Sequence, residues 1–292
     1  MNASNIENSV NYPFAHNIET IVVFSILIFT YSSIILFLAV MILRLRKNGF
    51  EKSTELIKNE LGGIIMSAAF AATEDELNEV ILQAKPEFSK KIKNASMAQV
   101  IINEVLTIHR SLTGQSKNNL ARLYHETCLM GYTMRNLKNE NWHVKASAIR
   151  DLAQINAESI IPKIEKYALA RNLYLQQVAQ IALVNLKGYD GLDFLGKLKN
   201  GLSDWQQINI LDVLRKLDKD KAPDFSQWLT HKEDTIKLFS IRLINFFQQS
   251  YNGDKLEEFV HSENRFLKTE AIATLEKIKP GYHFEHSKPV IT

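Results

Sequence analysis

An unbroken apolar run near the start of the chain constrains its fold more than any other feature. Residues 21–43 read IVVFSILIFTYSSIILFLAVMIL and contain no charged side chain. As a helix that rises about 1.5 Å per residue, this run spans the roughly 30 Å hydrocarbon layer of a bilayer. Ser25, Thr30, Ser32 and Ser33 do not prevent this, because their hydroxyls can bond to carbonyls of their own helix. The sequence therefore predicts a transmembrane helix over residues 21–43.

The charges on either side of this run predict how the helix crosses the membrane. Residues 1–20 contain no lysine or arginine, whereas Arg44, Arg46 and Lys47 follow the run directly. Because basic flanks stay in the cytoplasm, we expect residues 1–20 to be a short extracytoplasmic N-terminus and the rest to be cytoplasmic. A cleaved signal peptide fits less well, since it has a basic start and an apolar run of roughly 7–15 residues. The prediction is a single-pass membrane protein that contacts the lipid bilayer through residues 21–43.

The composition of the chain predicts an all-α fold. Only 11 glycines and 6 prolines occur in 292 residues, and 46% of the residues are hydrophobic. A chain with few helix breakers and ample apolar surface is expected to fold as packed helices. The net charge of +3 mixes both signs, so we do not expect nucleic acid as the main partner.

Residues 44–140 form a juxtamembrane region that apolar spacing predicts to be helical. The stretch at 61–72, LGGIIMSAAFAA, is too short to cross a bilayer and is expected to be a buried helix. Thr73 with Glu76, and Ser96 with Gln99, have the spacing of a capping box. A further helix is expected over residues 117–129. One face of it would carry Leu120, Leu123, Tyr124 and Thr127.

Two basic clusters, at residues 44–58 and 85–93, leave a further class of partner open. The first has five bases against two acids, and the second has four lysines against one glutamate. Such clusters attract anionic lipid headgroups or nucleic acid, but they also occur as solvated helix faces and topology signals.

A five-residue apolar pattern recurs through residues 141–280. It consists of two adjacent apolar residues, two spacers and a large apolar residue, and its closing residues lie 34, 28, 33 and 28 positions apart. The closing residues are Leu152, Leu186, Leu214, Phe247 and Leu275. Repeats of this period are typical of stacked helical units, so we expect these side chains to be equivalent buried positions. Leu275, in the last unit, is the one expected nearest to an exposed edge.

A second apolar stretch in each unit predicts helix pairs. These second stretches lie at 160–164, 192–195, 225–229 and 256–260, after loop residues such as Gly188 and Gly253. We expect about five pairs, the last incomplete, followed by a C-terminal tail at 281–292. A single pair cannot bury its apolar faces, so a continuous core requires the pairs to stack.

The repeats resemble HEAT repeats, of the short kind also found in bilin-lyase-like proteins. Residues 144–152, VKASAIRDL, and 266–275, FLKTEAIATL, are similar to the first helix of that unit, with Lys145 and Lys268 at its basic position. The middle repeats depart from the pattern, since Trp205 and two glutamines open the third. The resemblance implies a right-handed α-α superhelix, a HEAT-like solenoid. An anchor followed by a cytosolic array of this kind also resembles bacterial inner-membrane proteins.

The resemblance also implies where a partner would bind. HEAT proteins are mostly scaffolds, and their second helices line the concave face of the array. The expected partner-binding residues on the second stretches are Lys163, Lys166, Tyr167, Lys197, Gln227 and His231.

The sequence contains no residue set typical of a catalytic, cofactor or metal site. The single cysteine, Cys128, follows His125 by three residues, but no third residue completes a nucleophile–base–orienter set. His125 begins a pattern similar to a zinc-protease motif, yet Leu129 stands where the second histidine is required. His283 and His286 have no third ligand nearby. We therefore expect neither enzymatic activity nor a cofactor.

The leading functional prediction is a membrane-anchored cytosolic scaffold that binds a protein partner, not yet identified, at the inner face of the membrane. One alternative is a bilin-lyase-like enzyme or accessory factor, against which Cys128 counts because it lies outside the recognisable repeats. A further alternative is binding of the membrane surface or of nucleic acid through the two basic clusters.

Overall fold

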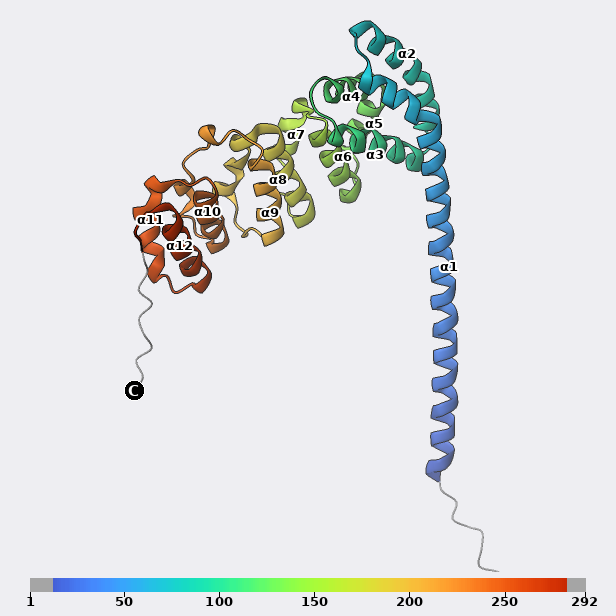
Figure 1. Cartoon of the computed structure of the whole chain (residues 1–292). Coiled ribbons are helices and arrows are strands. Elements are labelled where there is room, and N and C mark those ends of the chain that lie inside the picture. The colour runs from blue at the N-terminus through green and yellow to red at the C-terminus, as the bar shows by residue number, and fades with distance from the viewer. Residues whose placement is uncertain (1–12, 283–292) are drawn as a thin grey trace, which may run out of the picture. The chain divides into compact units, whose positions relative to one another are not determined.

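The computed structural model describes residues 13–282, without side chains for residues 13–19, 46–54, 56 and 58, and every regular element among them is a helix (Figure 1). The α-helices are α1 Pro13–Phe70, α2 Glu74–Lys91, α3 Ala95–Ser111, α4 Gly114–Glu126, α5 Cys128–Asn136, α6 Trp142–Gln154, α7 Ile161–Glu165, α8 Leu173–Lys187, α9 Asp204–Leu214, α10 Asp234–Phe246, α11 Gly253–Glu257 and α12 Arg265–Ile278. The 3-10 helices are η1 Glu158–Ile160, η2 Gly188–Lys197, η3 Lys219–Lys221, η4 Phe225–Trp228, η5 Ser250–Asn252 and η6 Glu258–His261.

The chain divides into two compact units, residues 1–62 and 63–292. Helix α1 has 58 residues and continues through the boundary that the sequence suggested between the apolar run and the region after it. Its only proline, Pro13, is its first residue, where a proline removes no hydrogen bond from the helix. The predicted span and residues 61–70 of the predicted helix at 61–72 are therefore parts of one helix.

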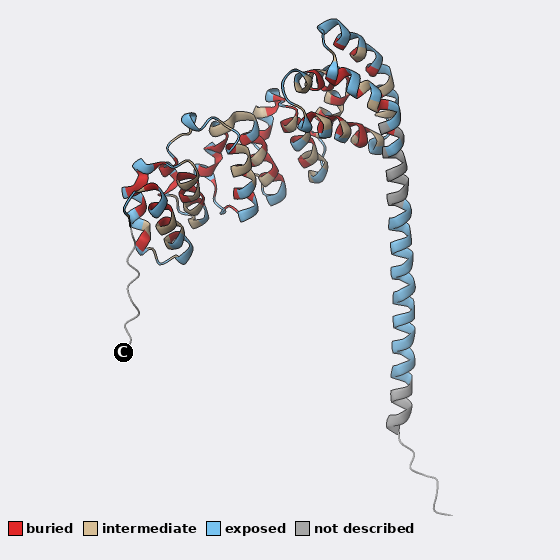
Figure 2. Cartoon of the chain, viewed as in Figure 1, coloured by how far each residue is buried: buried red, intermediate tan, exposed pale blue. Residues whose placement is uncertain are grey.

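One segment of α1 is long and apolar enough to cross a membrane. Thr20–Leu45 has 26 residues and a mean hydropathy of 2.6, and all its side chains are exposed (Figure 2). The Ser25 hydroxyl donates to the Ile21 carbonyl at 2.8 Å, and that of Thr30 donates to the Ile26 carbonyl at 2.7 Å. These bonds are the ones expected of hydroxyl side chains in an apolar helix, and they leave the segment apolar on every side.

Further along α1, the apolar stretch at 61–72 is buried on one face only. Ile65, Ala68 and Ala69 are buried, whereas Met66 and Phe70 are exposed. The prediction of a buried helix is thus correct for one face of α1 only. The apolar run covers more of the helix surface than the face that packs against the core, so some of its residues stay exposed.

Helices α2 to α5 follow in the second unit, and one of the two predicted caps is present. Thr73 accepts the Glu76 backbone N–H at 3.2 Å and so caps α2. The prediction of Ser96 as the cap of α3 is wrong, because Asn94 occupies that position and accepts the N–H groups of Ser96 and Met97. Asparagine caps a helix as effectively as serine, so the predicted and observed caps differ only in their position along the chain.

The predicted helix at 117–129 is observed as two helices, α4 and α5, which meet at Thr127. Leu120, Leu123 and Tyr124 are buried, as their spacing predicts. The Tyr124 hydroxyl lies 2.5 Å from the Thr133 hydroxyl of α5, which holds the two helices together. Thr127 is also buried, but its backbone is extended between the two helices.

The first helix of each predicted repeat is observed, as α6, α8, α9, α10 and α12. Four of the five begin after a side chain that caps the first turn: Asn141, Asn172, Ser203 or Asn264. The α6–α8, α8–α9 and α10–α12 pairs pack directly against each other, so sequence neighbours are spatial neighbours (Figure 1). This packing is compatible with stacked repeats.

The second stretches are shorter and tighter than the predicted second helices. They form short α-helices such as α7 and 3-10 helices such as η2 and η4, each of which packs on an adjacent first helix. Gly188, at the end of α8, has a φ of +62°, which ends the helix there. Gly191 lies so close to α8 that a Cβ would meet the Val184 Cα at 2.5 Å. Short apolar stretches interrupted by glycine therefore favour 3-10 turns over full helices.

Three of the five closing positions are buried as predicted. Leu152, Leu214 and Leu275 have no exposed surface. Leu186 and Phe247 are only half-buried, because α8 ends directly after Leu186 and the Phe247 ring belongs to a separate cluster. Leu275 is covered despite its place in the last unit, since α11 and η6 pack on α12.

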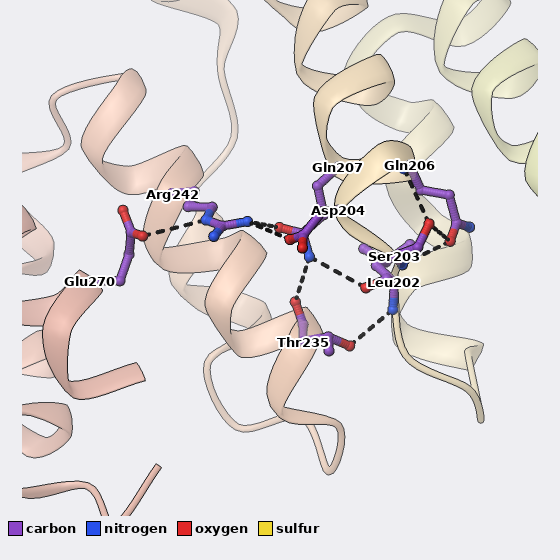
Figure 3. A network of polar contacts seen from close by, with 8 residues as sticks. All are labelled: Leu202, Ser203, Asp204, Gln206, Gln207, Thr235, Arg242 and Glu270. Atoms are coloured by element: carbon purple, nitrogen blue, oxygen red, sulfur yellow. Dashed lines mark hydrogen bonds and ion pairs between the residues drawn. The ribbon is translucent and has the colours of Figure 1, made fainter. Parts of the chain in front are cut away.

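Aromatic rings pack where η2 and η4 meet the end of α10. The rings of Phe225 and Phe247 lie 5.0 Å apart, and Tyr189 of η2 lies 5.8 Å from Phe247. A polar contact joins α9 to α10, because Arg242 of α10 donates to Gln207 of α9 at 2.7 Å (Figure 3).

Arg242 is the centre of a polar network that joins three successive first helices. It forms ion pairs with Asp204 of α9 at 3.2 Å and Glu270 of α12 at 3.4 Å (Figure 3). The neighbouring Gln206 points the other way and donates to Gln180 of α8 at 2.8 Å. The glutamines that depart from the HEAT pattern therefore link adjacent helices to one another.

Candidate functional site

Three hollows follow one another along the second stretches of the repeats. The first, of about 330 Å³, is lined by Lys138 just after α5 and by Lys163, Lys166 and Tyr167 on and after α7. The second, of about 650 Å³, is formed by the turns after η2 and η4. The third, of about 200 Å³, lies between α7, the end of α8 and η2. We call these three hollows together the basic trough.

The basic trough contains all six residues that the sequence singled out for partner binding. Lys163, Lys166 and Tyr167 line the first hollow. Lys197, Gln227 and His231 line the second, and Lys197 also lines the third. The sequence pattern did not indicate Lys138, Lys199 and Lys232, because they follow α5, η2 and η4 in loops that no helical period marks.

In the first hollow, two lysine ammonium groups lie close to the Tyr167 ring. The Lys145 ammonium lies 5.1 Å from the centre of the Tyr167 ring, and the Lys166 ammonium lies 5.2 Å from it. Lys145 occupies the basic position of the HEAT-like pattern, so its place against Tyr167 gives that position a structural role. Cation–π contacts of this kind fix the ring while leaving both charges available to a ligand.

In the second hollow, a backbone contact orients His231. Its Nδ1 accepts the Glu233 backbone N–H at 3.0 Å. In the neutral ring, Nε2 therefore carries the proton and is left as a donor. Lys197, Lys199 and Lys232 surround it, and Glu233 is the one acid among the residues that line this hollow.

The third hollow is more acidic than its neighbours and also exposes an apolar side chain. Leu169 keeps 49% of its surface exposed there, and Phe194 forms part of the wall. Lys187 is neutralised by Glu165 at 3.1 Å. Asp190 and Asp193 add two exposed acids. The first and second hollows are thus the cationic ends of the basic trough. The third hollow lies between them and has no excess positive charge.

The other residues considered in the sequence do not join this site. Arg44 is exposed on α1, and the side chains of Arg46 and Lys47 lie outside the described residues. His125 is in the last turn of α4 and Cys128 begins α5, so a helix break at Thr127 separates them.

Metal ligation has no candidate in the described part of the chain, where no three histidine, cysteine or acidic side chains come together. His283 and His286 lie outside the described residues.

Two titratable groups with shifted pKa values lie outside the trough: the buried His109 of α3 and the half-buried Asp151 of α6. His109 is 2% exposed, and its Nδ1 has no hydrogen-bond partner among the described atoms. Burial, with a smaller contribution from the Lys117 charge, lowers the pKa of His109 from 6.5 to about 4. Burial raises the pKa of Asp151 from 3.8 to about 6, although a hydrogen bond from Gln99 and the Arg150 charge oppose this.

These two groups are expected to give opposite pH dependences of stability. Because His109 binds its proton more weakly when folded, its contribution falls as pH drops from about 6.5 to about 4. Asp151 binds its proton more tightly when folded, so its contribution rises as pH drops from about 6 to about 4. The shifts, from 6.5 to about 4 for His109 and from 3.8 to about 6 for Asp151, each correspond to roughly 3 kcal/mol, so the two contributions oppose each other in the wild type.

Removal of Asp151 should therefore expose the effect of His109. We expect Asp151→Asn to lose about 2–3 kcal/mol of unfolding free energy relative to wild type between pH 6.5 and pH 4. Urea unfolding of the full chain in detergent, followed by tryptophan fluorescence, reports on this unit because all three tryptophans lie in it. His109→Gln should give the opposite slope. Equal slopes for wild type and both variants would show that neither group is linked to folding.

Comparisons with known proteins assign no family. No protein-family model matches the chain, and no curated protein matches it. Among solved structures, the crystal structure of an engineered protein from the Northeast Structural Genomics Consortium is 15% identical and aligns with 82% of this chain and 99% of its own. Its TM-score is 0.30, too low to carry an argument about fold or function.

Proposed function

We propose that this protein is a single-pass membrane protein whose helical unit is a cytoplasmic docking platform for a protein partner. The observation that supports this most is the basic trough, in which the six side chains chosen from the sequence line neighbouring hollows. The trough extends over second stretches of successive repeats, so a partner bound there would contact several repeats at once. Stacked repeats of the HEAT-like, right-handed kind typically present such extended surfaces.

The anchor in this proposal is Thr20–Leu45, and its charge flanks give the orientation. Its exposed apolar side chains require a cover, which a bilayer supplies. Arg44, Arg46 and Lys47 favour a cytoplasmic C-terminal side, with residues 1–20 outside. The platform would then act at the inner face of the membrane, and the anchor would restrict its search for partners to that surface.

Cross-linking in intact cells tests this proposal. A photo-reactive phenylalanine derivative placed at Tyr167 and, separately, at Gln227 should yield one protein adduct of the same mass, because both positions face the trough. The matched control position is Lys277, exposed on α12 and outside the three hollows. Protease added outside the cells should leave residues 63–292 intact.

Two results would reject the proposal. Adducts that form equally from Lys277, or from no position at all, would remove the trough as a docking site. Digestion of residues 63–292 by external protease would reverse the orientation.

A further inference from the structure

The three hollows of the basic trough lie next to one another. Lys197 lines both the second and the third hollow. On α7, Lys163 lines the first hollow and Glu165 lines the third, so these two hollows lie on different faces of this short helix. A single extended ligand that crosses α7 can therefore contact all three hollows.

The positive charge of the trough is available to such a ligand. Its six exposed lysines form no ion pair with another described residue: Lys138, Lys163, Lys166, Lys197, Lys199 and Lys232. Other lysines of the repeats are paired, as Lys187 is with Glu165 and Lys279 is with Glu257. Unpaired like charges held on one surface repel each other, and a polyanionic ligand relieves that repulsion.

The charge pattern distinguishes between classes of polyanion. A nucleic acid carries phosphates at regular intervals and would place some of them beside Asp190 and Asp193 in the middle hollow. A lipid headgroup is a compact anion and would occupy one end only. A polypeptide can instead alternate acidic and apolar residues, and so match cationic ends and a middle that exposes Leu169.

We propose that the basic trough binds an extended acidic segment of the partner protein, with an apolar residue between two acidic groups. This inference rests on the proposed function and specifies the chemistry of its partner. The acidic groups contact the lysines of the first and second hollows, and the apolar residue packs on Leu169 and Phe194 in the third. Binding is electrostatic at both ends and is therefore weakened by salt.

A defined peptide tests this chemistry on the full chain in nanodiscs of phosphatidylcholine, which adds no net surface charge. The probe is a fluorescent peptide with a glutamate triplet on either side of a short leucine–alanine stretch. We expect Lys163→Glu with Lys166→Glu, and separately Lys197→Glu with Lys199→Glu, each to weaken binding about tenfold, the equivalent of about 1.4 kcal/mol. The matched control, Lys85→Glu with Lys93→Glu, changes the net charge equally on exposed lysines outside the trough and should alter binding less than about twofold.

Further arms decide each part of the proposal. The same peptide with glutamine in place of glutamate should not bind, and a peptide of glutamate alone should bind more weakly than the probe. Equal weakening by the control pair would overturn the site, and equal binding of the all-glutamate peptide would overturn the apolar centre. The acidic-segment proposal is wrong if a single-stranded RNA or phosphatidylserine vesicles bind, the lysine-to-glutamate variants of the trough weaken that binding, and the peptide does not bind.

Two measurements keep these outcomes interpretable. If a charge-reversed variant loses its helical dichroism, Lys163→Gln with Lys166→Gln replaces it. Loss of wild-type peptide binding at high salt separately tests whether binding is electrostatic. A trough that cross-links to a protein in cells but shows no charge dependence with the peptide would refute the acidic segment alone. The docking function would then still stand.

Discussion

Replacement of Gly191 with alanine is expected to destabilise the helical unit by about 3 kcal/mol or more, the upper end of the cost of overpacking. A Cβ at this position would lie 2.5 Å from both the Leu183 carbonyl oxygen and the Val184 Cα. Both atoms are backbone atoms of α8, so no side-chain rotation relieves the overlap. Either η2 must move away from α8, or α8 must bend. The free energy of unfolding from urea titration of the full chain in detergent is the measurement.

Gly196 provides a matched control within the same 3-10 helix. A Cβ there meets no atom within 4 Å, and its backbone has no positive φ. Gly196→Ala is expected to be neutral or to stabilise by up to about 1 kcal/mol, because alanine restricts the unfolded chain. If the two substitutions had equal effects, the close packing of η2 on α8 would be wrong.

Truncation of Leu214 to alanine should cost about 2–5 kcal/mol and should loosen more than its own repeat. Leu214 closes α9 and has no exposed surface. Because stacked repeats derive stability from their neighbours, a cavity at this position weakens the interfaces on both sides. Hydrogen exchange should therefore show reduced protection in α8 and α10 as well as in α9.

Leu186 is the matched control for Leu214, since it closes the same five-residue pattern but is only half-buried. Leu186→Ala should cost clearly less than Leu214→Ala, as less apolar surface returns to water. Loss of protection in Leu214→Ala that stays within residues 205–234 would contradict the stacked arrangement of these repeats.

Local signals in the sequence predict much of this fold. The apolar run predicts the exposed segment of α1, and the recurring five-residue pattern predicts α6, α8, α9, α10 and α12. These predictions succeed because a long charge-free run and a regular helical period each depend on residues close together in the chain. The same local pattern predicts Leu186 and Leu214 as equivalents, although their burial differs. Burial depends on where a helix ends and on what covers it, and a pattern of neighbouring residues does not contain that information.

The second stretches show the same limit more clearly. Their apolar residues predict a buried face, yet the conformation depends on how closely the backbone approaches the first helix, as at Gly191. The six candidate residues of the trough were predicted by resemblance, whereas Lys138, Lys199 and Lys232 required the loops to be placed. The pKa shifts of His109 and Asp151 were also beyond prediction, because desolvation is the sum of contacts from several helices.

The Arg242 network makes one joint of the array sensitive to ionic strength. Helix α9 is bonded to α8 through the uncharged amides of Gln206 and Gln180, whereas its contact with α10 includes the Arg242–Asp204 ion pair. Dissolved salt screens the ion pair between α9 and α10 and leaves the amide hydrogen bond between α9 and α8 unchanged. The segment that connects the two helices includes η3, with exposed Lys219 and Lys221, which are cleavage sites for trypsin. Limited proteolysis in concentrated salt would therefore cut the array there first, and would release α10 to α12 as one fragment.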